Sequence, residues 1–387
     1  MRIGYSFWGY LGDVKFDYNT KIVASTPDGN AFYSWAIINE LLKRGHTVYQ
    51  MMPDRDSTGS DVLGDDLLFM AWASDKRKSA YENTKKTLCI DSVKQLDESM
   101  VHSIWEDCFA NGCELIIHEW RMEIPGRNTE DARNESCWQP DLFIQECLID
   151  FCIIHRIKMV IFDLDYKLSL DNIESLKERG LDFVVFELGN KWNGKDWAKK
   201  VYIPFDFDSI YEFKPKSWVK DKLVYVGNRY ERDWCIDKYI PKNMGDVTVY
   251  GNWNEGGRDS AIRWPNINFG HRLQTAEMQK VYSNSASTIL LAKHDYCEFG
   301  FMTARIIEAL FYGTVPLFIE EYGDELIREF AGSMAKTLTV HSVEDVVYKC
   351  NELFTNYVMR VTIINNLRER LKKFMDVKYF VDELLSC

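Results

Sequence analysis

The stretch around residue 300 combines residue types that bind a negatively charged ligand. A loop containing Gly300 follows an apolar strand pattern, and a helix is expected over residues 303–312 with Thr303 and Arg305 in its first turn. This layout can hold an anion, because free N–H groups and the positive end of the helix dipole face it. Glu308, one turn further along, could accept hydrogen bonds from a ribose diol beside phosphates. The pattern predicts a nucleotide diphosphate site, with an ordinary βαβ unit as the alternative.

Polar and glycine residues also follow the earlier apolar strands of the second half of the chain. GNRYER follows a strand expected over residues 223–226, YGNW follows one over 247–250, and GHR precedes a helix near 276–283. Parallel strands bring the segments that follow them to one edge of a sheet. These motifs therefore add anion-binding and nucleoside-binding features to the same predicted site.

Three aspartates in the first half are candidates for acid–base chemistry. Asp28 lies in a turn before a helix expected over residues 31–43, and a turn-stabilising role is the alternative. Asp163 and Asp165 flank one residue at the end of a strand expected over 158–162. They could line a cleft, or hold a divalent metal against a diphosphate. The metal interpretation is disfavoured because residues 163–165 lie in the first half of the chain, whereas the predicted diphosphate-binding stretch around residue 300 lies in the second.

The alternation of strands and helices divides the chain into two α/β halves. It predicts a parallel, doubly wound sheet in each half, and 387 residues suit two such domains. We expect an N-terminal Rossmann-like domain over residues 1–208 and a C-terminal one over 209–387 that ends in two or three helices. The polar segment 205–222 would link them. Further strands are expected over 200–205 and 288–292. The first βα unit lacks GxGxxG, so it is no dinucleotide fingerprint.

The composition is that of an acidic globular protein. Hydrophobic residues make up 46% of the chain, and the longest apolar runs have the length of a strand rather than of a membrane span. The N-terminus lacks a signal-peptide pattern, so we expect a cytoplasmic protein without membrane contact. Ten cysteines without CxxC pairing favour free thiols over a zinc or disulfide framework.

The charge pattern bears on nucleic-acid binding. A net charge of −12 argues against a broad nucleic-acid-binding surface but allows a local basic patch. One basic segment contains Lys76, Arg77 and Lys78, and a second contains Arg121 and Arg127. Both could contact a polyanion, and solvated surface charge is the alternative interpretation.

The order of the motifs in the second half resembles the GT-B glycosyltransferases, which use nucleotide-sugar donors. The resemblance covers the two-domain layout and, more specifically, residues 223–330, with GNRYER, YGNW, GHR and EFGFMTARIIEALFYGTVP. It implies two Rossmann-like domains facing across a cleft, with a UDP-sugar bound by the C-terminal one. The donor-binding residues that it implies are Gly227, Asn228, Arg229, Arg232, Gly251, Asn252, His271, Arg272, Leu273, Glu298, Phe299, Gly300, Phe301, Met302, Thr303, Ala304, Arg305 and Glu308.

The same resemblance implies how the donor would react. Arg229, Arg232 and a helix N-terminus would stabilise the charge that builds on the departing diphosphate, so Mg²⁺ or Mn²⁺ would not be required. In an inverting reaction, Asp28 or one of Asp163 and Asp165 would deprotonate the acceptor hydroxyl. Closure of the cleft would exclude water.

One departure from the family pattern concerns stereochemistry. Retaining members often have two glutamates with seven residues between them. Here Gly300 stands at the position that would pair with Glu308, and the nearest acid is Glu298. Retaining and inverting chemistry therefore both stay open.

The segments MRIGYSFWGYLGD and TPDGN also resemble phage-encoded glycosyltransferases. The acceptor implied is 5-hydroxymethylcytosine in double-stranded DNA, with glucose or arabinose as the sugar and the base extruded from the duplex. The basic segments would contact phosphates, and the protein would act in the host cytoplasm. The alternatives are a surface glycan, lipid or small-molecule acceptor, and a non-catalytic nucleotide-binding module. The oligomeric state is not predicted.

Overall fold

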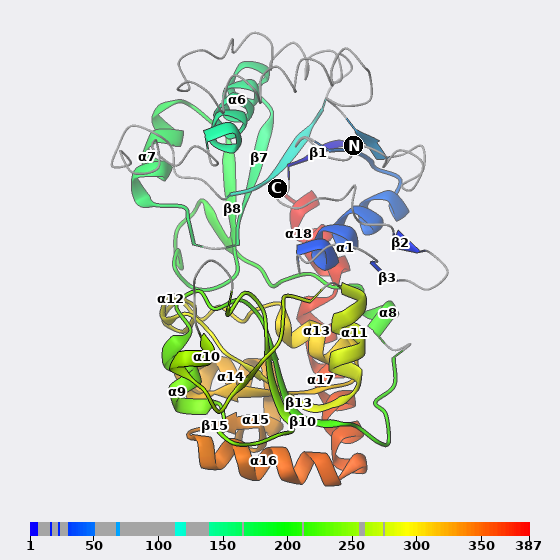
Figure 1. Cartoon of the computed structure of the whole chain (residues 1–387). Helices are drawn as coiled ribbons and strands as arrows, with labels where there is room; N and C mark the ends of the chain where they lie inside the picture. Colours follow the sequence, from blue (N-terminus) through cyan, green and yellow to red (C-terminus); the bar gives the residue numbers. More distant parts are fainter. Residues whose placement is uncertain are drawn as a thin grey trace.

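The computed structural model describes residues 1–6, 16–17, 22–23, 30–50, 67–69, 113–120, 139–164, 166–210, 213–254, 260–273 and 275–387. These residues form two parallel sheets, one of seven strands and one of six, stacked end to end with helices around each (Figure 1). The expected fold class, two α/β units with parallel sheets, is confirmed.

The first sheet has the strand order β5-β4-β1-β6-β7-β8-β9. Its strands are β1 (Arg2–Ser6), β4 (Thr47–Gln50), β5 (Leu67–Phe69), β6 (Leu115–Glu119), β7 (Lys158–Asp163), β8 (Phe183–Glu187) and β9 (Ala198–Lys200). A separate antiparallel pair is formed by β2 (Phe16–Asp17) and β3 (Ile22–Val23). The helices described in this half are α1 (Asn30–Lys43), α6 (Gln139–His155) and α7 (Leu170–Glu178).

The second sheet has the strand order β12-β11-β10-β13-β14-β15. Its strands are β10 (Asp221–Val226), β11 (Val247–Tyr250), β12 (Asn268–Phe269), β13 (Ser285–Leu290), β14 (Val315–Ile319) and β15 (Thr339–Val340). The helices from α8 onward are α8 (Phe207–Ile210), α9 (Asp233–Tyr239), α10 (Ser260–Arg263), α11 (Thr275–Ser283), α12 (His294–Glu298), α13 (Arg305–Phe311), α14 (Asp324–Ala331), α15 (Ala335–Leu338), α16 (Val343–Thr355), α17 (Tyr357–Met375) and α18 (Val377–Leu385), with 3-10 turns Glu320–Tyr322 and Gly332–Met334.

Both sheets reverse their strand order next to their first strand. β1 lies between β4 and β6, and β10 lies between β11 and β13. All residues of β6, β13 and β14 are buried, as expected for strands covered on both faces. At such a reversal the loops that follow the two strands diverge, and open α/β sheets bind their ligands there. The fold therefore offers one candidate binding edge in each half.

Two segments of the chain pass between the two halves side by side, one near residue 205 and the other near residue 376. Phe205 donates its N–H to Met375 O and accepts from Val377 N, each at 2.9 Å. Beyond this crossing, α18 lies beside α1 of the first half (Figure 1), where Arg44 Nη1 bonds Asp382 Oδ1 at 2.6 Å. The Phe380 ring packs on two aromatic rings of the first sheet. The C-terminal helices are thus present as expected, and the last of them covers the first sheet.

Two strands differ from their sequence-based bounds. The strand expected over residues 288–292 is β13, shifted toward the N-terminus. Leu291 and Ala292 are buried beyond its end, where their carbonyls accept from Arg232 and Cys235 instead of from a neighbouring strand. The expected strand 200–205 is replaced by β9, which ends at residue 200, and by the crossing at Phe205.

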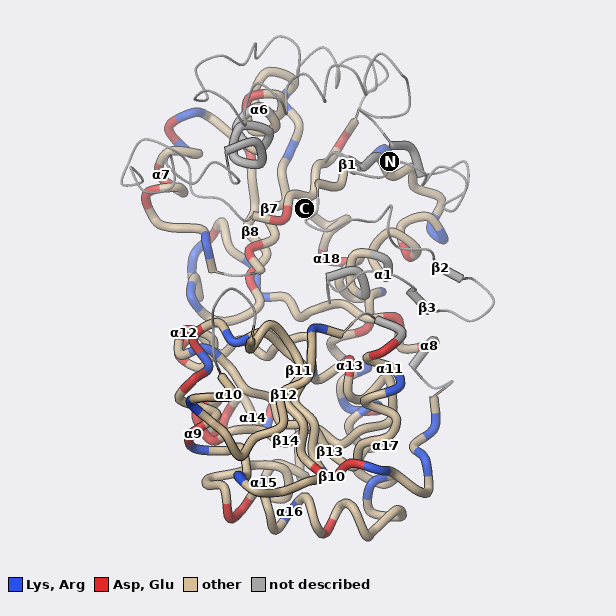
Figure 2. The backbone as a smooth tube through the Cα atoms, in the orientation of Figure 1, with Lys and Arg blue, Asp and Glu red and all other residues tan. Residues whose placement is uncertain are grey.

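Basic and acidic residues are interspersed along the chain of the second half, for example around α9 (Figure 2). Arg263 bonds both Asp233 and Asp237 there. Within the described ranges, no helix has the length and apolar character needed to cross a membrane.

Candidate functional site

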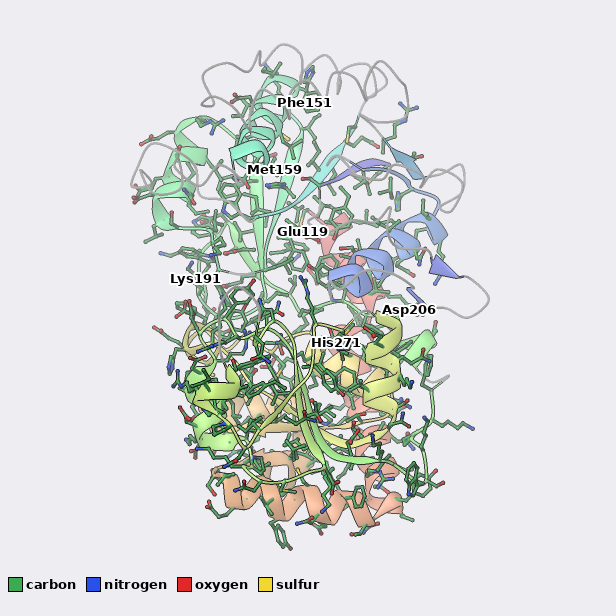
Figure 3. All side chains as sticks on the ribbon, viewed as in Figure 1. Glu119, Phe151, Met159, Lys191, Asp206 and His271 are labelled. Atoms are coloured by element: carbon green, nitrogen blue, oxygen red, sulfur yellow. The ribbon has the colours of Figure 1, made fainter. Side chains whose placement is uncertain are left out.

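The two binding edges face each other. Asn190, beyond the end of β8, donates its N–H to Phe299 O at 2.8 Å, and Phe299 follows β13. Figure 3 shows Glu119 and Lys191 on the side of the first half that faces the second, with His271 at the opposing end of the second. Segments from both sheets therefore meet at one place.

Two glycines let the loops after β10 and β11 approach closely. Gly251 has φ +140°, and a Cβ there would lie 2.2 Å from Gly227 O, so a side chain at this position would collide. Gly227 N donates to Tyr250 O at 2.9 Å, and Trp253 Nε1 donates to Gly227 O at 2.8 Å. Asn252 Oδ1 accepts from Arg229 N at 3.0 Å. These bonds hold the first two predicted motifs together.

Arg305 joins this pair of loops to the segment near residue 300. Its Nε donates to Val226 O at 2.7 Å, and its guanidinium lies 5.5 Å from the centroid of the Tyr225 ring. A Cβ at Gly227 would be 2.5 Å from both Nε and Nη2 of Arg305. Glycine at 227 is therefore the residue that lets Arg305 lie against the end of β10.

Arg229 and Arg232 have different surroundings. Arg229 makes a two-bond ion pair with Asp233, at 2.7 and 2.6 Å, and its guanidinium also lies over Trp264. Arg232 is 3% exposed and donates to the carbonyls of Asn228, Tyr230 and Leu291. Among the described residues, Arg232 and Arg305 have no carboxylate within ion-pair distance. Removing a cation from water without an ion-pair partner is unfavourable, so both arginines are candidates for binding an anion.

Glu308 is buried one turn into α13. Burial raises the pKa of its carboxyl, and the nearby charge of Arg305 and the hydroxyl of Tyr282 act in the opposite direction. The hydroxyls of Thr303 and Tyr225 are buried and have no hydrogen-bond partner among the described residues. Near Arg305 there are thus hydroxyl groups that could donate hydrogen bonds to a bound ligand.

The helix that carries Arg305 is shorter than predicted. It begins at Arg305 itself, so Thr303 and Ala304 precede it, and the loop before it contains the short helix α12. The predicted donor residues that remain differ in exposure. His271, Arg272 and Glu298 are exposed, Phe299 and Gly300 are half-buried, and Leu273, Phe301 and Met302 are buried. His271 Nε2 bonds Glu277 Oε1 at 3.2 Å.

The predicted catalytic and DNA-binding residues fall mostly outside the described ranges. This holds for Asp28, Asp165, Lys76, Arg77, Lys78, Arg121 and Arg127. Asp163 is described: it ends β7, is fully buried, and accepts from Lys167 N at 3.0 Å. This contact stabilises the turn after β7. In the described part of the chain, no three His, Cys, Asp or Glu side chains are grouped as metal ligands would be.

Glu119, which sequence reasoning passed over, lies at the binding edge of the first sheet. It ends β6, next to β1, and its buried Oε1 accepts from Tyr5 at 3.0 Å and from Ser34 at 3.2 Å. The neighbouring His118 bonds Ser6 and Gln145, and burial lowers its pKa to about 4, so it is neutral at pH 7. The available signal was a charged residue at the end of an otherwise apolar strand.

Comparison with known proteins supports the fold. No protein-family model matches the chain, and no curated protein matches it by sequence. Among solved structures, it is similar to a DNA-modifying β-glucosyltransferase studied with uridine diphosphoglucose, at 13% identity, covering 100% of this chain and 98% of that one, with a TM-score of 0.55. An α-glucosyltransferase in complex with UDP-glucose and DNA gives 13% identity, the same coverage of both chains, and a TM-score of 0.51.

A third similar structure is that of Anabaena HepE with UDP-glucose. The two proteins are 11% identical, the similarity covers 100% of each chain, and the TM-score is 0.56. At these identities the likeness establishes the fold, which is GT-B, as the sequence motifs implied.

Proposed function

We propose that the protein is a glycosyltransferase that moves a sugar from a UDP-sugar to a hydroxyl acceptor. The observation that carries the proposal is a pair of arginines at the strand reversal of the second sheet, the buried Arg232 and the half-buried Arg305. In the described part of the chain neither has a carboxylate within ion-pair distance. Glu308 lies one turn after Arg305 and suits a ribose diol. Similar structures hold UDP-glucose, which supports uridine as the base.

In this proposal the residues of the second half act on the leaving group. Negative charge builds on the diphosphate as its bond to the anomeric carbon breaks. Arg232 and Arg305 stabilise that charge without requiring a metal. The resemblance implied that Arg229 binds the diphosphate. Because the charge of Arg229 is already paired with Asp233, we instead give Arg229 the role of positioning the loop.

The first half would bind the acceptor, with the domain boundary near residue 208. If the reaction inverts, a carboxylate on this side takes the proton of the acceptor hydroxyl. Asp28, Asp163 and Asp165 stay candidates. Glu119 joins them because it lies at the strand reversal of the first sheet, where the acceptor would enter.

The acceptor we propose is 5-hydroxymethylcytosine in duplex DNA. Two of the similar structures are DNA-related glucosyltransferases, and the N-terminal motifs resemble phage enzymes of this kind. The basic segments at 76–78 and at Arg121 and Arg127 would contact phosphates, and the reaction would take place in the host cytoplasm. A surface glycan, lipid or small-molecule acceptor is the second candidate.

The test uses a panel of UDP-sugars and two duplexes of identical sequence, one with 5-hydroxymethylcytosine and one with cytosine. The proposal predicts a mass increase of one sugar residue on the modified duplex only, and its loss in Arg232→Gln. UDP binding with no transfer to either duplex would reject the DNA acceptor. No binding of UDP would reject the donor site itself.

A further inference from the structure

The loop after β8 reaches across to the segment that precedes α13. Asn190 N donates to Phe299 O at 2.8 Å, and a Cβ at Gly189 would lie 2.3 Å from the same oxygen. Contact between backbones this close requires glycine at 189. The first half therefore touches the second at the backbone of residues 299 and 300.

This loop is held firmly within the first half. Lys191 Nζ donates to the carbonyls of Tyr166 and Leu168, at 3.1 and 2.6 Å. Trp192 N donates to Glu187 Oε2 at 2.9 Å. The Tyr166 ring packs against the rings of Phe299 and Phe301. These contacts anchor the backbone of the loop to the first half, beside the segment that contains Phe299 and Phe301.

Gly300 leaves space that the side chain of Asn190 borders. Gly300 has φ +69°, a backbone conformation that residues other than glycine rarely adopt. A Cβ at this position would lie 3.0 Å from Asn190 Nδ2. A glutamate, as in the two-glutamate pattern, would be strained and would meet this amide. The Asn190 side chain is exposed, and its amide has no hydrogen-bond partner among the described residues. An amide can both donate to and accept from sugar hydroxyls.

The position of the transferred sugar follows from the proposed function. The diphosphate lies at Arg232 and Arg305, and the acceptor comes from the first half. The sugar, attached to the terminal phosphate, must lie between them, and the segment 299–301 leads through residues 302–304 to Arg305. We infer that Asn190 forms a wall of this sugar subsite and selects the sugar through hydrogen bonds from its amide, across the domain interface. This inference rests on the proposed UDP-sugar donor.

The experiment measures how much the sugar adds to binding. Calorimetry gives the affinity for UDP and for a panel of UDP-sugars, for the wild type and for Asn190→Ala. The matched control is Asn193→Ala, an exposed asparagine on the same loop. Because no acceptor is needed, the result does not depend on the identity of the acceptor. Asn190→Asp, which keeps the size of the side chain but removes its N–H donors, is the second variant.

The inference predicts that Asn190→Ala binds UDP as the wild type does, whereas the advantage of the preferred UDP-sugar over UDP falls by roughly threefold to tenfold, the loss of one or two neutral hydrogen bonds. Preference among the sugars of the panel narrows, and Asn193→Ala leaves both quantities unchanged. An unchanged sugar preference in Asn190→Ala, with UDP still bound, overturns this inference alone. A wild type that does not bind UDP overturns the proposed function and the inference together.

Discussion

Arg305 Nε donates to Val226 O at 2.7 Å, which ties the first turn of α13 to the end of β10 across the strand reversal of the second sheet. The bond uses one donor of the guanidinium, which has no carboxylate within ion-pair distance among the described residues, although the Glu308 carboxyl one turn away interacts with its charge. Gly227, next to Val226, lets the two segments come this close. The anion site we propose is built around this contact.

Glu308→Gln is expected to weaken UDP binding by roughly tenfold to a hundredfold, because a carboxylate that accepts from a ribose diol makes a charged hydrogen bond. The variant should lose the preference for UDP over its 2′,3′-dideoxy analogue. Calorimetry with both nucleotides measures this. An equal loss of affinity for both nucleotides would contradict the ribose contact.

The same variant makes a prediction on pH. Burial raises the pKa of Glu308 in the folded protein, so between its ordinary and its raised pKa the folded state holds a proton that the unfolded state has lost. Stability without ligand therefore falls as pH rises through this window. Glu308→Gln should remove that slope and leave the melting temperature at neutral pH equal or higher. If the stability of the wild type relative to Glu308→Gln rises with pH through this window, the prediction is refuted.

How far the sequence predicts this site can be seen at two arginines. Both follow the first strand of the second half, and nothing in GNRYER separates their roles. The structure shows that Asp233, one turn away, pairs with Arg229, whereas Arg232 turns inward to backbone carbonyls. The strands and the order of the motifs could be predicted because apolar runs and glycines are local features of the sequence. Which ion pairs and hydrogen bonds the two arginines make depends on tertiary packing.

The residues that sequence reasoning missed are set by long-range contacts. Glu119 gains its importance from Tyr5 and Ser34, which are far from it along the chain. Asn190 gains its importance from a loop in the other half. Periodicity and spacing in the sequence do not predict such contacts, because the contacts depend on the register of the sheets and on how the two halves are oriented toward each other.

Gly189→Ala should disturb the contact between the halves. The added Cβ would lie 2.2 Å from the Tyr166 hydroxyl and 2.3 Å from Phe299 O, so the facing segments must move apart. Displacement by about 1 Å can cost a hundredfold in rate, so we expect transfer to fall by roughly tenfold to a hundredfold while UDP affinity is retained. Gly245→Ala, where a Cβ meets nothing within 4 Å, is the control. Wild-type transfer in Gly189→Ala would rule out a role for this contact.

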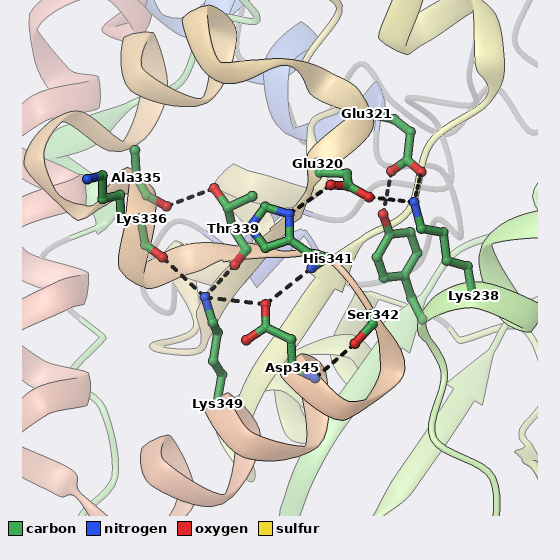
Figure 4. Close-up of polar contacts among 11 residues, drawn as sticks. Lys238, Glu320, Glu321, Ala335, Lys336, Thr339, His341, Ser342, Asp345 and Lys349 are labelled. Atoms are coloured by element: carbon green, nitrogen blue, oxygen red, sulfur yellow. Dashed lines mark hydrogen bonds and ion pairs between the residues drawn. The ribbon is translucent and has the colours of Figure 1, made fainter.

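Lys238→Met should affect stability and not binding. Lys238 Nζ bonds Glu320 at 2.6 Å and Glu321 at 2.7 Å, and His341 also bonds Glu320 (Figure 4). These side chains are partly exposed, so the expected loss is about 1 kcal/mol or less, and a melting temperature lower by roughly 2 °C. Wild-type UDP affinity is expected, and a large loss of binding would place this network in the site.

The pH dependence of this network has the opposite sign to that of Glu308. Hydrogen bonds from Lys238 and His341 lower the pKa of Glu320. Its stabilising effect is therefore present above the ordinary pKa of glutamate and is lost as pH falls through the lowered value. The difference in melting temperature between the wild type and Lys238→Met should shrink in acid. A difference that grows in acid would contradict the ion pairing.

The central claim is that a nucleotide diphosphate binds at Arg232 and Arg305, beside the strand reversal of the second sheet. Titration of UDP into the wild type, into Arg232→Gln and into Arg263→Gln tests it most directly, with melting temperatures to verify folding. Arg263 is a surface arginine that pairs with Asp233. The account predicts binding by the wild type, a loss of roughly tenfold or more in Arg232→Gln, and little change in Arg263→Gln. A wild type that does not bind UDP, or a folded Arg232→Gln that binds it as tightly as the wild type, would contradict the account.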